Sequence, residues 1–469
     1  MSQLIQVLEQ DVSPWPVATL GDGLLENVQP GFACGNHNSG GEGIVHVRPY
    51  NVTTDGRMDF STLKFIPISE VTKPERLLSQ GDVVFNNTNS PELVGKTAFY
   101  ADSEERAFSN HMTRIRVNQD KLRPEYLALA LHQLWREGYF ADKCNNHVSQ
   151  ASISRTVLLE TEIALPPLSE QDRLVEALTA TEEAVDRARN RLATIPTLLK
   201  KFRQSVLASA CAGQLTADWR EENRQYSSNG LILDLKSKWS SSRERQLAAA
   251  ITQDVTELPG LPDTWEYLEC RKLTDPSRSL TYGVIKLGEQ DDDGVPCLRS
   301  SDVRRLHINE SKVKKISRKI EEGFKRTSLL GGEVVVTVRG TLGGVAVVPL
   351  HMRGFNVSRE VAVIPIADPI NPSFVAFAIA SEPQSKWLGE VAKGVAYTGI
   401  NIEDLCRLPI PVPPIEEQAE IVRRVEALFS LADSIESRLT EATAQVERTT
   451  QAILAKAIRG DLTGGSDVL

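Results

Sequence analysis

Two short stretches have residue types that could bind a nucleotide or a metal. Gly95–Thr97 matches the end of a phosphate-binding loop, but the first glycine of that motif would fall at Ser90. Without that glycine the backbone cannot wrap around phosphates. Cys34 and His37 have the spacing of half a zinc site, yet no second pair follows them. We therefore expect neither a nucleotide site nor a metal site in these stretches.

The residues that could support catalysis also form only incomplete motifs. Asp302, Glu310 and Lys312 are the residue types of a metal-dependent nuclease, but their separation is short and common by chance. The chain contains no Asn/Asp-Pro-Pro-aromatic tetrapeptide of an amino-methyltransferase, and no GxGxxG follows a predicted strand. We expect no covalent chemistry from this chain.

A basic run lies between Arg299 and Arg326. Because the formal net charge of the chain is −9, any affinity for nucleic acid has to come from such local patches or from partner subunits. A solvated surface is the alternative interpretation, and it is the commoner one for an isolated charge run. The basic residues inside the run are Arg304, Arg305, Lys312, Lys314, Lys315, Arg318, Lys319 and Lys325.

The elements that would position these residues occur twice. Residues 165–192 align without a gap to residues 412–439, at an offset of 247, and the same offset pairs Gly213 with Gly460. The preceding regions repeat with offsets that drift between 248 and 251, so loop length varies there while helix length is fixed. A register held for about fifty residues indicates a tandem duplication.

Each repeated segment contains a heptad seam, with apolar residues at steps of four and three. Such a pattern favours a coiled coil over a surface helix, the alternative being two amphipathic helices that each pack on their own domain. We expect the seam to consist of Leu174, Leu178, Val185 and Leu192 in the first copy and Ile421, Val425, Leu428, Ile435 and Leu439 in the second.

The ends of these two helices carry recognisable signals. Ser169 with Asp172 predicts a capping box, and Glu416 and Glu417 complement the positive end of the second helix. Gly213 and Gly460 lie where C-caps are expected. Pro196 should kink or break the first helix.

Composition indicates an ordinary globular protein of the cytoplasm. The chain has 41% hydrophobic and 25% charged residues and no apolar run long enough to span a bilayer, and its first residues lack the features of a signal peptide. Six cysteines without a CxxC pair suit a reducing compartment. We expect a cytoplasmic location and no membrane contact.

Two globular regions, each followed by a Pro-Pro-[Leu/Ile]-x-Glu-Gln helix, resemble the specificity subunit of a type I restriction–modification enzyme. The stretches 195–204, 417–429 and 451–463 are especially similar to that family. The resemblance covers essentially the whole chain.

It implies α/β target-recognition domains in tandem, each followed by a long helix, with the helices paired as an antiparallel coiled coil with pseudo-twofold symmetry. The implied order is a first recognition domain at 1–165, a helical spacer at 166–222, a linker at 223–258, a second recognition domain at 259–411 and a second helical spacer at 412–469.

The resemblance further implies a non-catalytic chain that reads double-stranded DNA. Each recognition domain would read one half of a bipartite, asymmetric site, while the helices set the spacing and dock two methyltransferase subunits. Restriction subunits would join through the methyltransferase subunits. S-adenosylmethionine, ATP and Mg²⁺ are expected on these partners and no cofactor on this chain.

Polar loops at matching places in the two copies would carry the contacts to DNA, because amide, hydroxyl and guanidinium groups suit base edges; solvated turns are the alternative. Asp302 stands where the first copy has Asn51, and its charge weakens that pair as phosphate contacts. The residues expected to bind DNA are Arg48, Asn51, Asn86, Asn87, Thr88, Asn89, Ser90, Lys96, Ser149, Gln150, Ser152, Arg299, Arg304, Thr337, Arg339, Thr341, Tyr397, Thr398 and Asn401.

Two other classes of protein stay open at this point. One is a coiled-coil DNA-binding scaffold or regulator outside a restriction system, and the other is a subunit with a hidden nuclease site.

Overall fold

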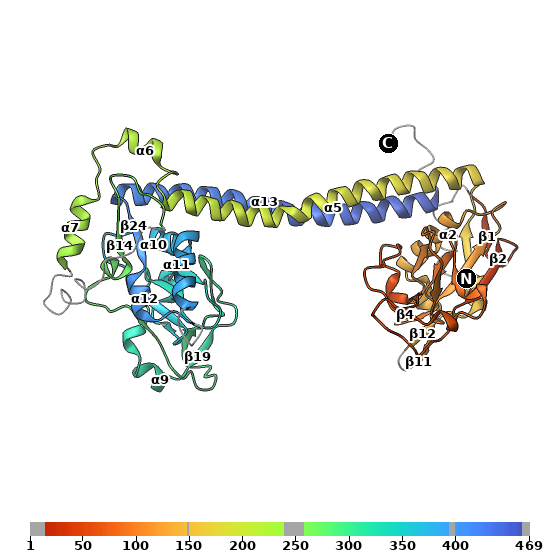
Figure 1. The fold of residues 1–469 in the computed structure, drawn as a ribbon, viewed down its shortest axis with the longest axis horizontal. Coiled ribbons are helices and arrows are strands. Elements are labelled where there is room, and N and C mark those ends of the chain that lie inside the picture. Colours follow the sequence, from red (N-terminus) through yellow and green to blue (C-terminus); the bar gives the residue numbers. More distant parts are fainter. Residues whose placement is uncertain (1–14, 148–149, 239–257, 394–398, 462–469) are drawn as a thin grey trace. The chain divides into compact units, whose positions relative to one another are not determined.

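The structure is a computed structural model that describes residues 15–147, 150–238, 258–393 and 399–461. The chain divides into two compact units, unit 1 comprising Met1–Ala193 with Thr440–Leu469 and unit 2 comprising Thr194–Leu439 (Figure 1). Two long helices, α5 and α13, contribute residues to both units. No helix in the described ranges combines the length and the apolar character needed to span a membrane.

Unit 1 contains two four-stranded sheets, ordered β2-β10-β6-β8 and β4-β3-β9-β5. The strand β6 is buried along its whole length, and α2 packs on β6 and β8 through its apolar face. The strands are β1 (Val17–Thr19), β2 (Leu25–Pro30), β3 (Ile44–Val47), β4 (Phe65–Ile66), β5 (Leu77–Leu78), β6 (Val83–Phe85), β7 (Thr88–Asn89), β8 (Thr97–Phe99), β9 (Arg106–Phe108), β10 (Thr113–Val117), β11 (Asn145–His147), β12 (Gln150–Ser152) and β13 (Glu162–Ala164). The helices are α2 (Pro124–Arg136), α3 (Tyr139–Lys143), α4 (Arg155–Leu159) and the first part of α5 (Leu168–Cys211).

Unit 2 repeats this plan. Its four-stranded sheet has the order β15-β23-β20-β21, and α10 covers it as α2 covers the sheet of unit 1. In both units the first strand pairs with the strand that precedes the long helix, β1 with β13 and β14 with β24. The strands are β14 (Glu266–Glu269), β15 (Thr281–Tyr282), β16 (Val295–Leu298), β17 (Val303–Arg304), β18 (His307–Ile308), β19 (Lys314–Ile316), β20 (Val334–Thr337), β21 (Val345–Val347), β22 (Asn356–Val357), β23 (Val361–Ile364) and β24 (Pro409–Val412). The helices are α6 (Ala217–Glu222), α7 (Asn229–Lys238), α9 (Arg318–Glu322), α10 (Pro372–Ala380), α11 (Glu382–Lys393), α12 (Ile402–Arg407) and the first part of α13 (Ile415–Arg459). The tandem α/β prediction is confirmed.

The two long helices pair antiparallel. In unit 1 the early residues Leu174 and Leu178 of α5 share a core with the late residues Leu454 and Ala457 of α13. In unit 2 the relation is reversed, because the late part of α5 shares a core with the early part of α13. The helices have nearly equal lengths, 44 and 45 residues, as the constant repeat offset predicts.

Burial along the predicted seam is uneven. Leu174, Leu178, Ile421 and Val425 are buried, and the other predicted seam residues are half-buried apart from Ile435, which is 38% exposed. Side chains near the helix starts are covered by a domain as well as by the other helix. Further along, the second helix alone provides cover, and this leaves Ile435 partly exposed.

Pro196 does not break α5, which continues through it to Cys211. The side chain is exposed, so water can bind the carbonyl oxygen that the proline ring deprives of an amide partner. Both C-caps are confirmed. Gly213 and Gly460 have φ of +73° and +89°, and the following residue donates its amide N–H five residues back, over 2.9 Å in the first copy and 3.0 Å in the second.

The predicted capping box is wrong, because α5 begins at Leu168 and Ser169 therefore lies inside its first turn. A glutamine two residues later has the anchoring role instead. The Gln171 side chain accepts from the Arg123 amide (2.7 Å), at the start of α2, and donates to the Pro166 carbonyl (2.8 Å). In unit 2, Gln418 makes the same pair of bonds with Asn371 and Pro413. The Pro-Pro-x-x-Glu-Gln motif thus ties each long helix to its domain.

The first turn of α13 contains Glu416 and Glu417, as expected, but Glu417 is fully buried. Its carboxylate accepts hydrogen bonds from Thr216 Oγ1 (2.7 Å), Arg220 Nη1 (2.5 Å) and Trp265 Nε1 (2.8 Å). The segment that follows α5 and the start of the second globular region are therefore held to one buried carboxylate.

Part of the predicted linker at 223–258 is folded. The helix α7 buries Ile232 and Leu235 in the core of unit 2, whereas residues 239–257 lie outside the described ranges.

Candidate nucleic-acid interface

Asn51, which was predicted to bind DNA, and its counterpart Asp302 close two equivalent turns. Asn51 Oδ1 accepts from the Arg48 amide (2.9 Å), and Asp302 Oδ2 accepts from the Arg299 amide (2.8 Å). Asn51 also donates to the carbonyls of residues 59 and 62. Both side chains are buried, at 2% and 4% exposure. In this structure both side chains are engaged in closing buried turns, so the prediction that Asn51 contacts DNA has no support from its burial.

Three other residues that were predicted to contact DNA, Asn86, Lys96 and Thr337, are also buried and bonded to the backbone of their own unit. Asn86 donates to the Pro49 carbonyl (3.0 Å), and Thr337 Oγ1 accepts from the Gly344 amide (2.8 Å). The ammonium of Lys96 donates to the carbonyl of residue 52, and burial lowers the pKa of Lys96. These side chains hold loops together within their own unit.

The arginines beside the two turns are also held. The Arg48 guanidinium lies against His37, whose Nε2 is 3.1 Å from His46 Nδ1. Burial, together with the charge of Arg48, lowers the pKa of His46 to about 4. Arg299 bonds to Asp302 through its side chain and donates to the carbonyl of residue 312 (2.8 Å). Both arginines support turns at the place where strand β3 or β16 ends.

Two of the residues considered for a nuclease site, Asp302 and Glu310, are bonded to different side chains. Asp302 is engaged by Arg299, and both oxygens of Glu310 lie 3.1 Å from Nε2 of His351. The two carboxylates therefore have separate partners.

Two of the polar loops of unit 1 lie side by side. β7, from the run 86–90, pairs with β12, from the run 149–154, and β11 completes a three-stranded sheet. The amide of Ile153 donates to the carbonyl of Asn87 (2.8 Å). Gln150 is exposed on this sheet, Ser152 and Thr88–Ser90 are half-buried, and Ser149 lies outside the described residues.

Unit 2 brings its polar loops together in the same way. The amide of Ile400 donates to the carbonyl of Val338 (2.8 Å), which is the counterpart of the bond between Ile153 and Asn87. Arg339 is exposed with its guanidinium 5.8 Å from the Tyr282 ring, and Thr341 is exposed beside it. Asn401 caps α12 by accepting from the Asp404 amide (2.8 Å) and remains exposed, while Tyr397 and Thr398 lie outside the described residues.

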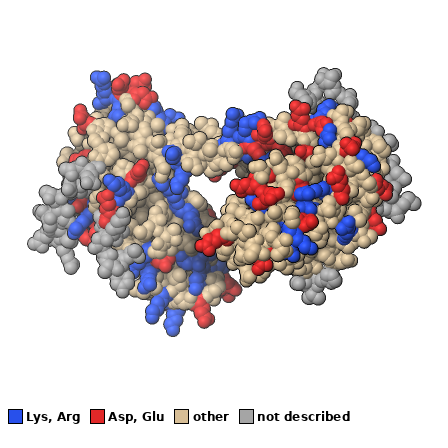
Figure 2. Space-filling model, turned by 45° about the vertical axis from the view of Figure 1, so that its right-hand side comes forward, with Lys and Arg blue, Asp and Glu red and all other residues tan. Residues whose placement is uncertain are grey.

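The basic run of unit 2 is a surface feature extending from β17 to the end of α9 and the turn after it. Lys314 and Lys315 donate to backbone carbonyls over 2.6 and 2.7 Å, and Arg305 donates to the carbonyl of Ala380. On the face shown in Figure 2, Lys and Arg side chains form a column over unit 2, at the left, while both signs mix over unit 1. The exposed basic residues of the run are Arg304, Arg305, Lys312, Arg318, Lys319, Lys325 and Arg326.

The corresponding stretch of unit 1 has fewer basic residues. Lys73 is exposed there, whereas three others have partners within the unit. Arg57 bonds to Glu182, Lys64 to Ser39, and Arg76 to the carbonyl of residue 70. Exposed basic residues such as Arg318 and Lys319 were not among the predicted DNA contacts. The basic run in the sequence pointed to these residues, but a solvated surface is the commoner interpretation of such a run.

A duplicated α/β domain, with polar loops joined at one place in each copy and a paired-helix segment, defines a tandem recognition protein. The sequence matches the family model described as the type I restriction modification DNA specificity domain, at residues 52–197 and 281–444. The chain therefore belongs to the family of type I restriction–modification specificity subunits, and the resemblance seen in its motifs is confirmed.

Relatives support the same assignment. The chain is 33% identical over 364 residues to the EcoBI specificity subunit of Escherichia coli, covering 77% of this chain and 70% of that protein. It is 26% identical to the EcoKI specificity subunit of Escherichia coli strain K12, over 89% and 82% of the two chains. The HsdS subunit of Thermoanaerobacter tengcongensis has the same fold, with a TM-score of 0.56 at 19% identity over 95% of this chain and 97% of that one.

Proposed function

We propose that this chain is the DNA-reading subunit of a type I restriction–modification complex, in which each unit reads one half of a bipartite, asymmetric site in double-stranded DNA. The observation that supports this is the equivalent loop junction, in which residue 153 bonds to residue 87 in unit 1 and residue 400 bonds to residue 338 in unit 2. The backbone of the junction is the same, but its side chains differ. Unit 1 has Asn-Asn-Thr-Asn-Ser at 86–90, and unit 2 has Thr-Val-Arg-Gly-Thr at the equivalent positions 337–341. Different side chains on one backbone frame would recognise different bases.

The paired helices would set the number of unread base pairs between the half-sites. Their lengths of 44 and 45 residues correspond to about 66 Å each at 1.5 Å per residue. The helices would also dock two methyltransferase subunits, which bring S-adenosylmethionine, and restriction subunits with ATP and Mg²⁺ would join through them. The chain itself would bind no cofactor and work in the cytoplasm.

The basic surface of unit 2 would supply phosphate contacts, which fix register without reading sequence. Because the net charge of the chain is −9, partner subunits would provide the rest of the attraction to DNA.

Methylome sequencing of cells that carry this chain with its methyltransferase partner tests the function. We expect one methylated motif made of two half-sites at a fixed separation. Arg339→Ala should change or abolish recognition in one half only, and Arg353→Ala, which removes another exposed arginine of unit 2, should leave the motif intact. Methylation without a bipartite motif would refute the function, whereas an unchanged motif with Arg339→Ala would only remove Arg339 from the interface.

A further inference from the structure

A cluster of charged side chains joins the globular part of unit 1 to its two helices. The loop after β3 carries Arg57, whose guanidinium bonds to Glu182 (3.1 Å) and to Asp186 on α5. From the same loop, Asp55 faces Arg189 of α5 at 3.5 Å and Arg136 of α2 at 3.6 Å. Four ion pairs thus connect the loop with a domain helix and with α5.

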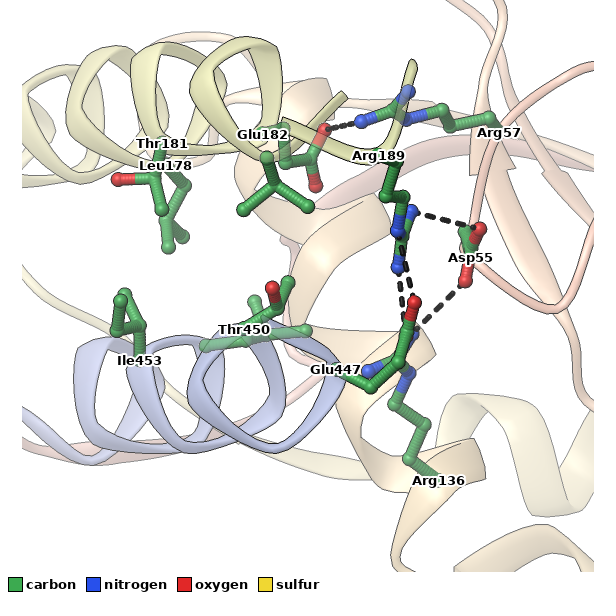
Figure 3. A pocket seen from close by; sticks show the side chains of 12 residues that line it. Asp55, Arg57, Arg136, Leu178, Thr181, Glu182, Arg189, Glu447, Thr450 and Ile453 are labelled. Atoms are coloured by element: carbon green, nitrogen blue, oxygen red, sulfur yellow. Dashed lines mark hydrogen bonds and ion pairs between the residues drawn. The ribbon is translucent and has the colours of Figure 1, made fainter. Parts of the chain in front are cut away.

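Arg189 extends the cluster to the second helix. Its Nε and Nη2 bond to the two carboxylate oxygens of Glu447 on α13, over 2.9 and 2.7 Å. Figure 3 shows Arg189 between Asp55 and Glu447, with Arg136 approaching from the far side. One guanidinium therefore contacts the loop and both helices of the pair. We call this set the polar joint: Asp55, Arg57, Arg136, Glu182, Asp186, Arg189 and Glu447.

The polar joint is accessible to solvent. Its side chains are between 20% and 49% exposed. They form one wall of a cavity of about 30 Å³ between α5 and α13, whose other wall includes the apolar side chains of Leu178, Val185 and Ile453. A larger pocket, of about 520 Å³, lies against the loop side of the joint. Salt in the solvent can therefore reach and screen the ion pairs.

Unit 2 has apolar side chains at two of the matching positions. Phe429 of α13 corresponds to Glu182 of α5, and Leu306 corresponds to Asp55 in the loop of unit 1. The rings of Phe429 and Phe377 have centroids 6.2 Å apart, and all three side chains pack against the core of unit 2. This contact between loop and helix is therefore apolar, and moderate salt does not weaken it. The ion pairs of Arg203 with Asp433 and Glu436 in unit 2 connect the two helices with each other.

We infer that the polar joint is the adjustable connection of this subunit, which holds the first recognition region against the helices with a strength set by ionic strength. Asp55 and Arg57 are then positioning residues for half-site spacing, although they touch no base. The inference rests on the proposed function.

Competition binding by the complex of this chain with its methyltransferase subunits tests the joint. Probes would carry both half-sites at the natural separation or at one base pair more or less, and the measured quantity is the affinity ratio between probes. Phosphate contacts common to both probes cancel in this ratio, so that its salt dependence reports the joint. For the wild type we expect the preference for the natural spacing to fall as salt rises.

The double variant Asp55→Asn with Arg57→Gln should lower this preference about fivefold at low salt and remove its salt dependence. Arg203→Gln is the matched control, since Arg203 bonds to Asp433 and Glu436 between the helices of unit 2, at 2.6 and 2.9 Å. This control should leave both the preference and its salt dependence unchanged.

Exchanging the charges of one ion pair distinguishes the loss of that pair from a general loss of folding. Arg57→Glu should lower the spacing preference, and adding Glu182→Arg should restore it. An unchanged preference in the neutralised variant, or an equal loss in Arg203→Gln, overturns the inference. If the wild-type complex binds all the probes equally whatever their half-site separation, the proposed function is contradicted as well. If the wild type and the neutralised double variant prefer the natural separation equally, only the inference about the joint is overturned.

Discussion

Glu417→Ala should destabilise unit 2 far more than the same change one repeat earlier. The Glu417 carboxylate is fully buried and accepts hydrogen bonds from three donors, which belong to Thr216, Arg220 and Trp265. Its counterpart at an offset of 247 is Glu170, which is 22% exposed and forms an ion pair with Arg173 on its own helix, at 2.7 Å. The two variants lose the same charge and the same side chain.

The structure sets the size of the difference. Removing one partner of a buried ion pair costs about 3–5 kcal/mol, because the remaining charge and donors stay buried without an acceptor. Arg220 keeps 19% of its side chain in water and Trp265 only 7% of its surface, so little of this loss is recovered by hydration. An exposed pair such as Glu170 with Arg173 contributes about 0.2–1 kcal/mol.

Urea unfolding followed by tryptophan fluorescence measures both costs. Three of the six tryptophans, at positions 219, 265 and 387, lie in the described part of unit 2 and report its unfolding. We expect a large fall in the midpoint for Glu417→Ala and a small one for Glu170→Ala. Equal shifts, or a loss below about 1 kcal/mol for Glu417→Ala, would refute the role assigned to the buried carboxylate.

Three other perturbations have definite expected outcomes. Asn51→Asp removes two buried amide donors and should lower the free energy of urea unfolding by about 2 kcal/mol. Asp302→Asn keeps an acceptor for its turn and should lower it by about 1 kcal/mol or less. A larger loss for Asp302→Asn than for Asn51→Asp would contradict the shared turn geometry. Because the pKa of His46 is about 4 in the folded state and about 6.5 when unfolded, its contribution is present above pH 6.5 and lost as the pH falls toward 4. The wild type should therefore lose about 2 kcal/mol more stability between pH 7 and pH 5 than His46→Gln, and parallel losses would disprove this. Replacing Arg318 and Lys319 by Gln should flatten the dependence of log affinity for DNA on log salt by about 1.8, or 0.9 per contact; an unchanged slope would exclude both from the phosphate contacts.

The helical spacers were predictable because their signal is periodic and local. Steps of four and three residues place Leu174, Leu178, Ile421 and Val425 on one face whatever the rest of the chain does, and these four are buried. The fixed repeat offset likewise predicted equal helix lengths. Exposure of Ile435 was not predictable, because the seam pattern does not reveal how far each domain extends along the helices.

The DNA contacts were less predictable because one residue type serves two purposes. Asn51, Asn86 and Thr337 have the amide and hydroxyl groups that suit base edges, and the same groups close buried turns. The three-residue spacing from Arg48 to Asn51, repeated from Arg299 to Asp302, was a local clue to the turns. The predicted capping box failed for a different reason, since the start of α5 is fixed by a bond between residues 171 and 123, which are far apart in the sequence.

Unit 1 is built from two stretches of chain that are made at different times. Residues 194–439 are synthesised before residue 440 can join residues 1–193, a delay of roughly 12–50 s at typical translation rates. During this interval Leu174 and Leu178 lack the cover that Leu454 and Ala457 later give them. Unit 2 can close as soon as its own residues have left the ribosome. The newly made chain thus has an exposed apolar helix face that a neighbouring nascent chain could cover with its own α13, so correct assembly depends on how quickly the chain is completed.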